Sequence, residues 1–192
     1  MRIIAGLAKG MPLAVPRAGV RPTADRIREA VFSSLGARVV GAHVLDLFAG
    51  TGALGLEAAS RGATSVMFVE SARSAVECLE RNLAAFQRNR EVACGFSVAR
   101  VAVKAQLRQL TTSGETFTLI FADPPYGQEA QELLRDAILP QLLASDALVV
   151  LESAKRDALA VTTPWEPVRQ AIYGDTRVDF LRCKPASTNT DG

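Results

Sequence analysis

Apolar positions recur with two different periods along this chain, and the change of period separates predicted strands from predicted helices. After Gly41, short runs that are almost wholly apolar alternate with longer stretches whose apolar residues return every three or four positions. The first pattern is typical of strands buried on both faces, and the second of amphipathic helices. Strands are predicted at 43–48, 65–70, 96–103, 117–122 and 147–153, and helices at 53–62, 71–89, 104–110 and 129–143.

Strands that alternate with helices imply a parallel, doubly wound sheet with helices on both faces. Two more apolar runs, 167–174 and 177–184, are separated only by a short turn, which predicts a terminal antiparallel hairpin. The predicted fold class is therefore α/β, with a mostly parallel seven-stranded sheet whose last strand is antiparallel, and with a small N-terminal extension.

The chain before this sheet is interrupted by glycine and proline. Residues 1–22 are expected to form short strands and turns as a basic extension, 23–185 the main domain, and 186–192 a flexible tail. A helix is predicted over 24–36, with Thr23 as its N-cap and Gly36 as its stop. In the same way, Ser71 is a candidate cap for the long helix that follows the second strand.

Composition and charge narrow the class of protein. The three cysteines are far apart and the chain has one histidine, so neither a zinc site nor a disulfide scaffold is expected. No apolar run has the length of a membrane span, and we expect a cytoplasmic protein without membrane contact. The net charge is +2, but residues 1–28 hold six basic residues against the single acid Asp25. Such a segment suits contact with nucleic-acid phosphates, or is an ordinary solvated arm.

The first strand of the sheet runs into a glycine loop that has two competing interpretations. Gly50, Gly52 and Gly55 match G-x-G-x-x-G, and Glu70 ends the next strand 20 residues after the first glycine. This spacing is that of a dinucleotide site, in which backbone amides face a pyrophosphate. Asp46 lies four residues before Gly50, where its charge would repel a pyrophosphate and instead attract a cation, or hold a charged ammonium group through water or the backbone. Of three interpretations of the loop, a site for S-adenosylmethionine, which is a sulfonium without phosphate, is favoured over a site for a nicotinamide or flavin and over a tight turn that binds no ligand.

The stretch "DPPY" follows the fourth strand and is predicted to face the glycine loop across one crevice. The amine of a nucleobase is a weak nucleophile because its lone pair is delocalised into the ring. The Asp123 carboxylate and the Pro124 carbonyl can each accept one of its N–H groups, and Pro125 restricts the backbone of Pro124. Tyr126 offers a flat face on which an extruded base can stack, worth about 1–3 kcal/mol. Together these residues predict a site for methylation of a nucleobase amine.

With these motifs in view, the sequence resembles the bacterial 16S rRNA (guanine-N2)-methyltransferases, a family of small class I methyltransferases. The resemblance rests on "RPTADRIREAVFSSL", "DLFAGTGALGLEAASRGA", "FVE" and "DPPY", and it spans roughly residues 2–184. It implies a 30S ribosomal subunit or an assembly intermediate as partner, with an N-terminal extension that helps to grip RNA. By position it implies a donor pocket of Asp46, Ala49, Gly50, Thr51, Gly52, Glu70, Ser71 and Ala102, an amine site of Asp123, Pro124 and Tyr126, and RNA contact or bracing by Arg21, Thr23, Arg26 and Arg28.

One departure and several alternatives remain open from the sequence. Related methyltransferases often carry an acid after the third strand, whereas here that region reads "ARVAVKAQL", so a backbone contact near Ala102 would have to replace it. "DPPY" also suits an adenine-N6 methyltransferase of DNA or RNA. A nicotinamide oxidoreductase and a non-catalytic ribosome-assembly factor are the alternatives of other classes. No apolar seam is left over, so a monomer is expected, and His43 and Trp165 are expected to be structural.

Overall fold

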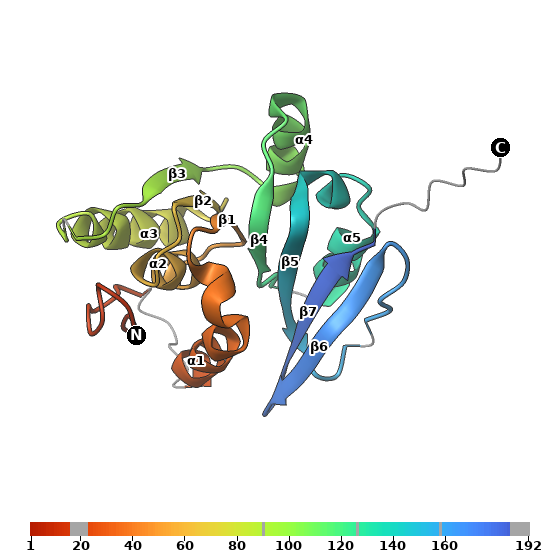
Figure 1. The fold of residues 1–192 in the computed structure, drawn as a ribbon, viewed down its shortest axis with the longest axis horizontal. Coiled ribbons are helices and arrows are strands. Elements are labelled where there is room, and N and C mark those ends of the chain that lie inside the picture. The colour runs from red at the N-terminus through yellow and green to blue at the C-terminus, as the bar shows by residue number, and fades with distance from the viewer. Residues whose placement is uncertain (16–22, 90, 126, 158, 185–192) are drawn as a thin grey trace.

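Seven strands form one sheet, in the order β3-β2-β1-β4-β5-β7-β6 (Figure 1). The structure is a computed structural model and describes residues 1–15, 23–89, 91–125, 127–157 and 159–184. The strands are β1 His43–Leu47, β2 Ser65–Val69, β3 Gly95–Ala99, β4 Phe117–Ala122, β5 Leu143–Ala154, β6 Trp165–Tyr173 and β7 Thr176–Cys183. Because the chain winds from β1 out to β3 and then returns to place β4 beside β1, the strand order reverses between these two strands.

The pairing confirms the predicted fold class. β1 pairs in parallel with β2 and β4, β2 with β3, and β4 with β5, whereas β7 runs antiparallel to both β5 and β6. In the register, Asp46 lies opposite Phe121, and Phe121 lies opposite Val150. The carboxyl ends of β1, β4 and β5 therefore meet at one edge of the sheet.

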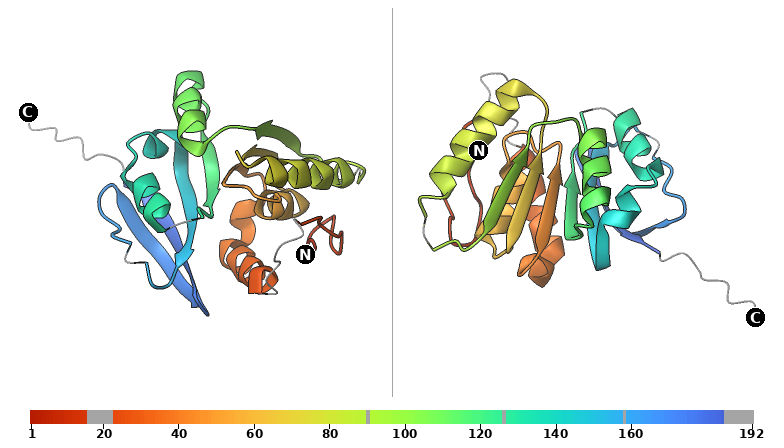
Figure 2. Two further views of the ribbon diagram at one scale, coloured as in Figure 1. Left: turned by 180° about the vertical axis from the view of Figure 1, so that it is seen from behind. Right: turned by 90° about the horizontal axis from the view of Figure 1, so that it is seen from above.

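Helices cover both faces of the sheet and bury two apolar layers. The helices are α1 Thr23–Leu35, α2 Ala53–Ser60, α3 Arg73–Phe86, α4 Val103–Ser113 and α5 Gly127–Arg135, with 3₁₀ turns η1 Gly36–Val39 and η2 Leu139–Leu142. The layer of Phe32, Leu56, Leu79 and Phe121 joins α1, α2 and α3 to one face. The other layer joins α4 and α5 to the opposite face. Figure 2 shows the hairpin of β6 and β7 at the edge of the sheet away from α3.

The N-terminal residues 1–15 form a tight hairpin that packs into the first of these layers. The N–H of Ile3 donates to the Met11 carbonyl at 2.9 Å, and the N–H of Gly10 donates to the Ile3 carbonyl at 2.9 Å. Ile3 and Leu13 are buried in the same cluster as α1 and α2. This part of the extension is therefore continuous with the core.

Several predicted boundaries differ from the structure, and three of the differences have a clear local reason. The helix predicted over 129–143 ends at Arg135, because the Asp136 side chain accepts the N–H of Ile138 at 2.8 Å and turns the chain into η2. The strand predicted over 96–103 stops at Ala99, opposite the last residue of β2, beyond which it has no partner. Ser71 does not cap α3, whose N-cap is Ala72.

Both residues that were expected to be structural have structural contacts. The indole N–H of Trp165 donates to the Leu134 carbonyl at 2.6 Å, and its side chain is buried against the α5 layer. A ring nitrogen of His43 lies 2.9 Å from the Ser65 hydroxyl at the amino end of β1. His43 is therefore remote from the carboxyl edge of the sheet.

Candidate active site

The glycine loop between β1 and α2 owes its glycines to backbone conformation and close packing. Gly50 and Gly52 have φ values of 57° and 79°, in the left-handed region that glycine adopts without strain. A Cβ on Gly52 would lie 2.4 Å from Leu79, and one on Gly55 would lie 2.3 Å from Phe68. Gly50 has no such neighbour, since the nearest atom to a built Cβ is 3.9 Å away. Space for a ligand beside the loop is therefore left at Gly50.

The buried side chain of Asp46 binds the first turn of α2, directly after this loop. Its carboxylate accepts the N–H of Gly55 at 2.9 Å, and the residue is 1% exposed. Burial, opposed by the hydrogen bond from the Gly55 N–H and aided by the nearby carboxylates of Asp123 and Glu70, raises the pKa of Asp46 to about 8. The expectation that Asp46 attracts a cation directly does not fit this position, whereas action through the backbone does.

Glu70, at the carboxyl end of β2, organises the turn into α3. One carboxylate oxygen accepts the N–H of Gly50 at 2.9 Å, and the other accepts the N–H groups of Ser71 at 2.8 Å and Ala72 at 2.7 Å. These bonds replace the cap that was expected from Ser71. A carboxylate oxygen has two lone pairs, so the oxygen bonded to Gly50 can accept one further hydrogen bond, such as that of a ribose hydroxyl.

A cavity of about 560 Å³ opens beside Glu70 at the carboxyl edge of the sheet. It lies between the ends of β2 and β4 and the helices α4 and α5, and this volume is in the range of ligand pockets. The cavity is lined by Phe48, Val69, Glu70, Ser71, Ala72, Ala102, Val103, Lys104, Leu107, Asp123, Pro125, Glu129, Glu132, Leu133 and Asp136.

Four of the predicted site residues, Glu70, Ser71, Ala102 and Asp123, line this cavity together. The other residues predicted for the donor pocket belong to β1 or to the glycine loop behind Glu70 and do not line it; they are Asp46, Ala49, Gly50, Thr51 and Gly52. Gly50 is nevertheless held in direct contact with the lining through the Glu70 carboxylate. The structure therefore brings the two motifs to one cavity and leaves most of the glycine loop as its support.

Most of the other lining residues were not predicted from the sequence, among them Phe48 and three acids. Phe48 follows β1 with a φ of 58°, which is strained for a residue with a side chain. Glu129, Glu132 and Asp136 lie one turn apart on and after α5, so their helical spacing was the available signal. No acid follows β3, so these three carboxylates from α5 and its C-terminal end are the acidic groups of the cavity besides Glu70 and Asp123.

One of these acids is already paired across the cavity mouth. Glu132 accepts from the Lys104 ammonium at 2.6 Å, and this bond lowers the pKa of Glu132 while it raises that of Lys104. Both side chains are more than half exposed, so the pair stabilises the fold little. Its position links the N-terminal turn of α4 to α5 over the apolar residues Leu107 and Leu133.

The turn after β4 brings the predicted amine site to the same cavity. Asp123 and Pro125 line it, and Pro124 is buried between them. Desolvation raises the pKa of Asp123. Tyr126, the third predicted catalytic residue, lies outside the described residues. The adjacency of β1 and β4 therefore places the Asp123 carboxylate and the glycine loop on the same edge, as the sequence predicted.

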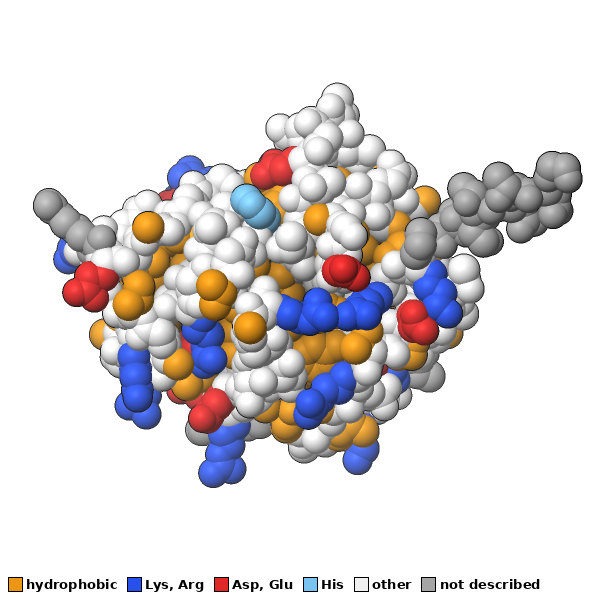
Figure 3. Space-filling model, viewed as in Figure 1, with side chains coloured by type: hydrophobic (Ala, Val, Ile, Leu, Met, Phe, Trp, Pro, Cys, Tyr) orange, Lys and Arg blue, Asp and Glu red, His pale blue; other side chains and the backbone are white. Residues whose placement is uncertain are grey.

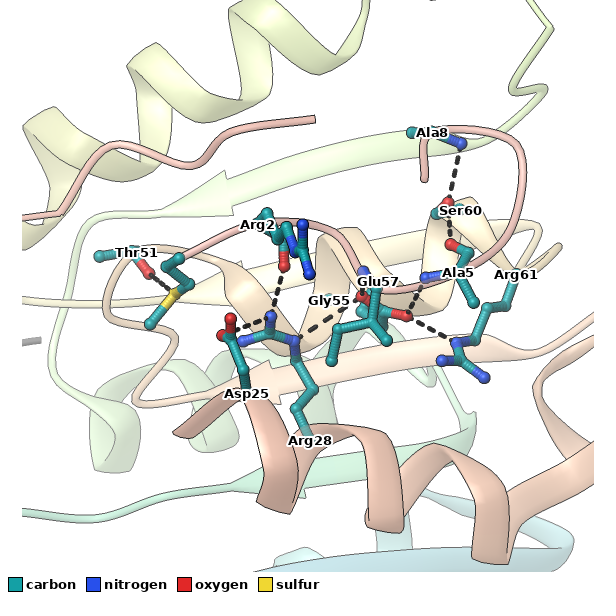
Figure 4. A network of polar contacts seen from close by, with 12 residues as sticks. Arg2, Ala5, Ala8, Asp25, Arg28, Thr51, Gly55, Glu57, Ser60 and Arg61 are labelled. Carbon is teal, nitrogen blue, oxygen red and sulfur yellow. Dashed lines mark hydrogen bonds and ion pairs between the residues drawn. The ribbon is translucent and has the colours of Figure 1, made fainter. Parts of the chain in front are cut away.

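The predicted RNA contacts divide into two groups. Arg26 is exposed on α1. Arg28 is 3% exposed and donates to the Arg2 carbonyl at 2.5 Å and to the Asp25 carboxylate at 3.0 Å (Figure 4). Of the two roles expected for Arg28, its contacts favour bracing over direct contact with RNA. Arg21 lies outside the described residues, and Thr23 is the first residue of α1.

Glu57 completes this brace and was not found from the sequence. It is fully buried on α2 and accepts the N–H groups of Ile4 at 2.7 Å and Ala5 at 3.0 Å (Figure 4). Arg61 donates to it at 2.7 Å, and the Arg28 Nε lies 3.7 Å from its carboxylate. The signal was that Glu57 is the one charged residue in the apolar helix "ALGLEAAS".

Asn82 connects the N-terminal hairpin to the glycine loop. Its amide accepts the N–H of Ala14 at 2.7 Å and donates to the carbonyls of Ala14 and Thr51, each at 2.9 Å. The residue is 2% exposed on α3. The Asn82 side chain thus ties the N-terminal hairpin to the loop beside the cavity.

Other chemistry is limited in the described part of the chain. The three cysteines are free, with Cys78 buried. No group of three His, Cys, Asp or Glu side chains among the described residues is arranged to hold a metal ion. None of the described helices is both long and apolar enough to span a membrane.

A mostly parallel seven-stranded sheet with an antiparallel β7 and a cavity at its carboxyl edge defines the class I methyltransferase fold. The chain belongs to the family described as Conserved hypothetical protein 95, whose model matches residues 1–182. It is 36% identical over 180 residues to "Ribosomal RNA small subunit methyltransferase D" of Escherichia coli K12, and the match covers 91% of this chain and 85% of the relative. The Haemophilus influenzae protein of the same name is 32% identical over 181 residues, with 91% and 89% of the two chains covered.

Solved structures agree with this assignment. The "hypothetical protein TTHA0928" from Thermus is 32% identical, with a TM-score of 0.77 over 94% of this chain and 98% of the other. The "rRNA methyltransferase aviRa" of Streptomyces viridochromogenes has a TM-score of 0.66 over 87% of each chain, and at 17% identity it supports the fold alone. The family resemblance drawn from the sequence motifs is therefore confirmed.

Proposed function

We propose that this protein is an S-adenosylmethionine-dependent methyltransferase that modifies the exocyclic N2 amine of a guanine in 16S rRNA of the small ribosomal subunit. The observation that carries the proposal is the single cavity that Glu70 and Asp123 both line. One end of it belongs to the glycine-loop motif and the other to the "DPPY" motif. The names of the Escherichia coli and Haemophilus influenzae relatives support small-subunit rRNA as the substrate.

The lining of the cavity suits the parts of the proposed donor. Glu70 retains one acceptor position for a ribose hydroxyl, beside Gly50. Val103, Leu107 and Leu133 provide apolar contact for an adenine ring, and the α5 carboxylates provide acceptors for its amino group. S-Adenosylmethionine supplies an electrophilic methyl group on a sulfonium. No phosphate site is needed, which suits a cavity whose charged lining residues, apart from Lys104, are acids.

The turn after β4 is proposed to activate the amine. The Asp123 carboxylate accepts one N–H of the guanine N2 amine and the Pro124 carbonyl accepts the other, which makes the nitrogen lone pair available. Alignment of reactants of this kind contributes up to about 7–11 kcal/mol to a rate enhancement. The proton leaves the nitrogen after methyl transfer, so no strong general base is required. Tyr126 is proposed to stack on the extruded base, as sequence reasoning suggested.

The RNA is proposed to approach over α1 and the N-terminal hairpin. Arg26 is exposed on α1, and Arg2 and Lys9 are exposed on the hairpin. Figure 3 shows Lys and Arg side chains around the centre and lower edge of the face that carries α1 and β7. A 30S subunit or assembly intermediate is the proposed partner of a monomeric protein in the cytoplasm.

Transfer of a tritiated methyl group to unmodified 30S particles and to naked 16S rRNA tests this function. We expect labelled N2-methylguanosine after digestion, and we expect it to be lost in Asp123→Ala while RNA binding persists. Glu115→Ala removes an exposed carboxylate at the opposite end of β4 and is the matched control. N6-methyladenosine as the labelled product would refute guanine as the target. Binding of NADH without binding of S-adenosylhomocysteine would refute the donor.

A further inference from the structure

Glu152 lies beside the proposed amine site on the neighbouring strand. Ala122 of β4 pairs with Leu151 of β5, so Asp123 and Glu152 are the next residues along two adjacent parallel strands. Asp123 lies two positions beyond Phe121, and Glu152 lies two positions beyond Val150. Phe121 and Val150 are both buried in the apolar layer that packs against α1. Since side chains on one face of a strand recur every second residue, both acids belong to the α1 side of the carboxyl edge.

Asp123 therefore lies between the cavity and Glu152. It lines the cavity proposed for the methyl donor, which α4 and α5 enclose from the far side of the sheet. Glu152 is half-buried on its other side, toward α1. A nucleobase whose amine reaches Asp123 from the α1 side would meet Glu152 with the rest of its hydrogen-bonding edge.

The groups around Glu152 leave its carboxyl available to a ligand. Asp46 is committed to the N–H of Gly55, and the buried Arg28 donates to Arg2 and Asp25. In the part of the chain that the structure describes, the Glu152 and Asp123 carboxyl groups accept no hydrogen bond and form no ion pair. Two neighbouring carboxyls without donors are unfavourable when both are charged, and a ligand with adjacent N–H groups would relieve this.

Electrostatics of the site are consistent with that picture. Burial, aided by the charges of Asp123 and Asp46 and opposed by that of Arg28 on α1, raises the pKa of Glu152 to about 8. Hydrogen bonds from a ligand to the ionised form favour ionisation. Binding of an N–H-bearing edge would therefore release a proton from this pair of acids near neutral pH.

We propose that Glu152 selects guanine at the target position by accepting the N1–H of its Watson–Crick edge, while Asp123 accepts an N–H of the adjacent N2 amine. The inference rests on the proposed function and deepens it. Guanine presents N1–H and N2–H donors side by side, whereas adenine presents an acceptor at N1 next to its amine. A carboxylate at Glu152 attracts the first arrangement and repels the second. This residue would thus supply the choice between guanine and adenine that "DPPY" alone leaves open.

The test replaces the target nucleotide rather than relying on a variant alone. Wild-type protein first methylates small-subunit RNA, and the labelled nucleotide is identified and mapped. That nucleotide is then replaced by 2-aminopurine in ligated RNA, assembled into particles if particles are the substrate. 2-Aminopurine keeps the amine but carries an acceptor at N1. A site that depends on a hydrogen bond to its substrate discriminates strongly against an analogue lacking it, so we expect wild-type kcat/KM to fall at least ~100-fold.

Glu152→Gln provides the second arm, because its amide can donate to the N1 acceptor of 2-aminopurine. We expect the preference for guanine over 2-aminopurine to shrink at least ~10-fold in this variant, with the Kd for S-adenosylhomocysteine within about twofold of wild type. Glu115→Gln should retain the wild-type preference. An unchanged preference in Glu152→Gln, or equal wild-type use of both bases, would overturn the role of Glu152 while leaving guanine-N2 methylation intact. Wild-type formation of N6-methyladenosine would overturn both proposals.

Discussion

Substitution of Asn82 by alanine should reveal how much the N-terminal hairpin supports the glycine loop. The change removes three hydrogen bonds at 2.7–2.9 Å and leaves the Ala14 N–H, the Ala14 carbonyl and the Thr51 carbonyl without their partner. A hydrogen bond contributes about 0.5–1.5 kcal/mol net, and an unsatisfied buried group costs about 1–3 kcal/mol. Because water can reach part of this site, we expect a loss of about 2–4 kcal/mol in the free energy of unfolding.

Two measurements check this prediction. Urea denaturation gives the free energy of unfolding, and calorimetry gives the Kd for S-adenosylhomocysteine, which we expect to weaken about 10-fold because the Thr51 carbonyl is released. Asn89→Ala is the matched control, since that amide makes two hydrogen bonds and both are exposed: it donates to the Leu7 carbonyl at 3.0 Å and accepts the N–H of Glu91 at 3.1 Å. A free energy of unfolding for Asn82→Ala within about 0.5 kcal/mol of that for Asn89→Ala would refute the reasoning.

Three further predictions follow from other contacts. Gly6→Ala places a Cβ 1.9 Å from the Ser60 carbonyl at a φ of 84°, whereas Gly10→Ala places one in open space at a similar φ. Gly10→Ala should lower the free energy of unfolding by the ~1–2 kcal/mol of backbone strain alone, and denaturation should show a larger loss for Gly6→Ala. The pKa of Asp46 is raised from 3.8 to about 8, so the stability that its protonated form contributes is complete below about pH 4 and is lost as the pH rises toward 8. Asp46→Asn removes this titration. A plot of the free energy of unfolding against pH should therefore fall less steeply for the variant between these two values, by up to ~1.4 kcal/mol per pH unit. Glu70→Ala leaves three N–H groups without their acceptor and should weaken S-adenosylhomocysteine binding at least ~10-fold by calorimetry.

The sheet was predictable because its strands carry a strong local signal. Runs such as 117–122 are apolar without interruption, and the short turn before β7 allows only a hairpin. Boundaries failed where one side chain or a missing partner decided the outcome. Asp136 ends α5, and β3 ends where β2 no longer pairs with it. Neither of these ends can be recognised from the periodicity of apolar residues in the sequence.

The candidate site was predictable to the extent that motifs lie at strand ends. Glu70 and Asp123 were placed correctly because the carboxyl ends of parallel strands share an edge. Glu57 and Asn82 were not found, because the segment that they hold, at Ile4 and Ala5 for Glu57 and at Ala14 for Asn82, lies more than fifty positions away in the sequence. Glu152 was passed over because an acid at the end of an apolar strand is common, and its meaning depends on which strand lies beside it.

The docking of residues 1–15 has a consequence for the order of events during synthesis. Their acceptors and donors lie on Glu57, Ser60 and Asn82, so residues 1–15 leave the ribosome before the residues that they bind. Residues 1–15 are therefore expected to become ordered only after α2 and α3 have been made. Until then their apolar residues, Ile3 and Leu13 among them, are exposed to other nascent chains and to chaperones.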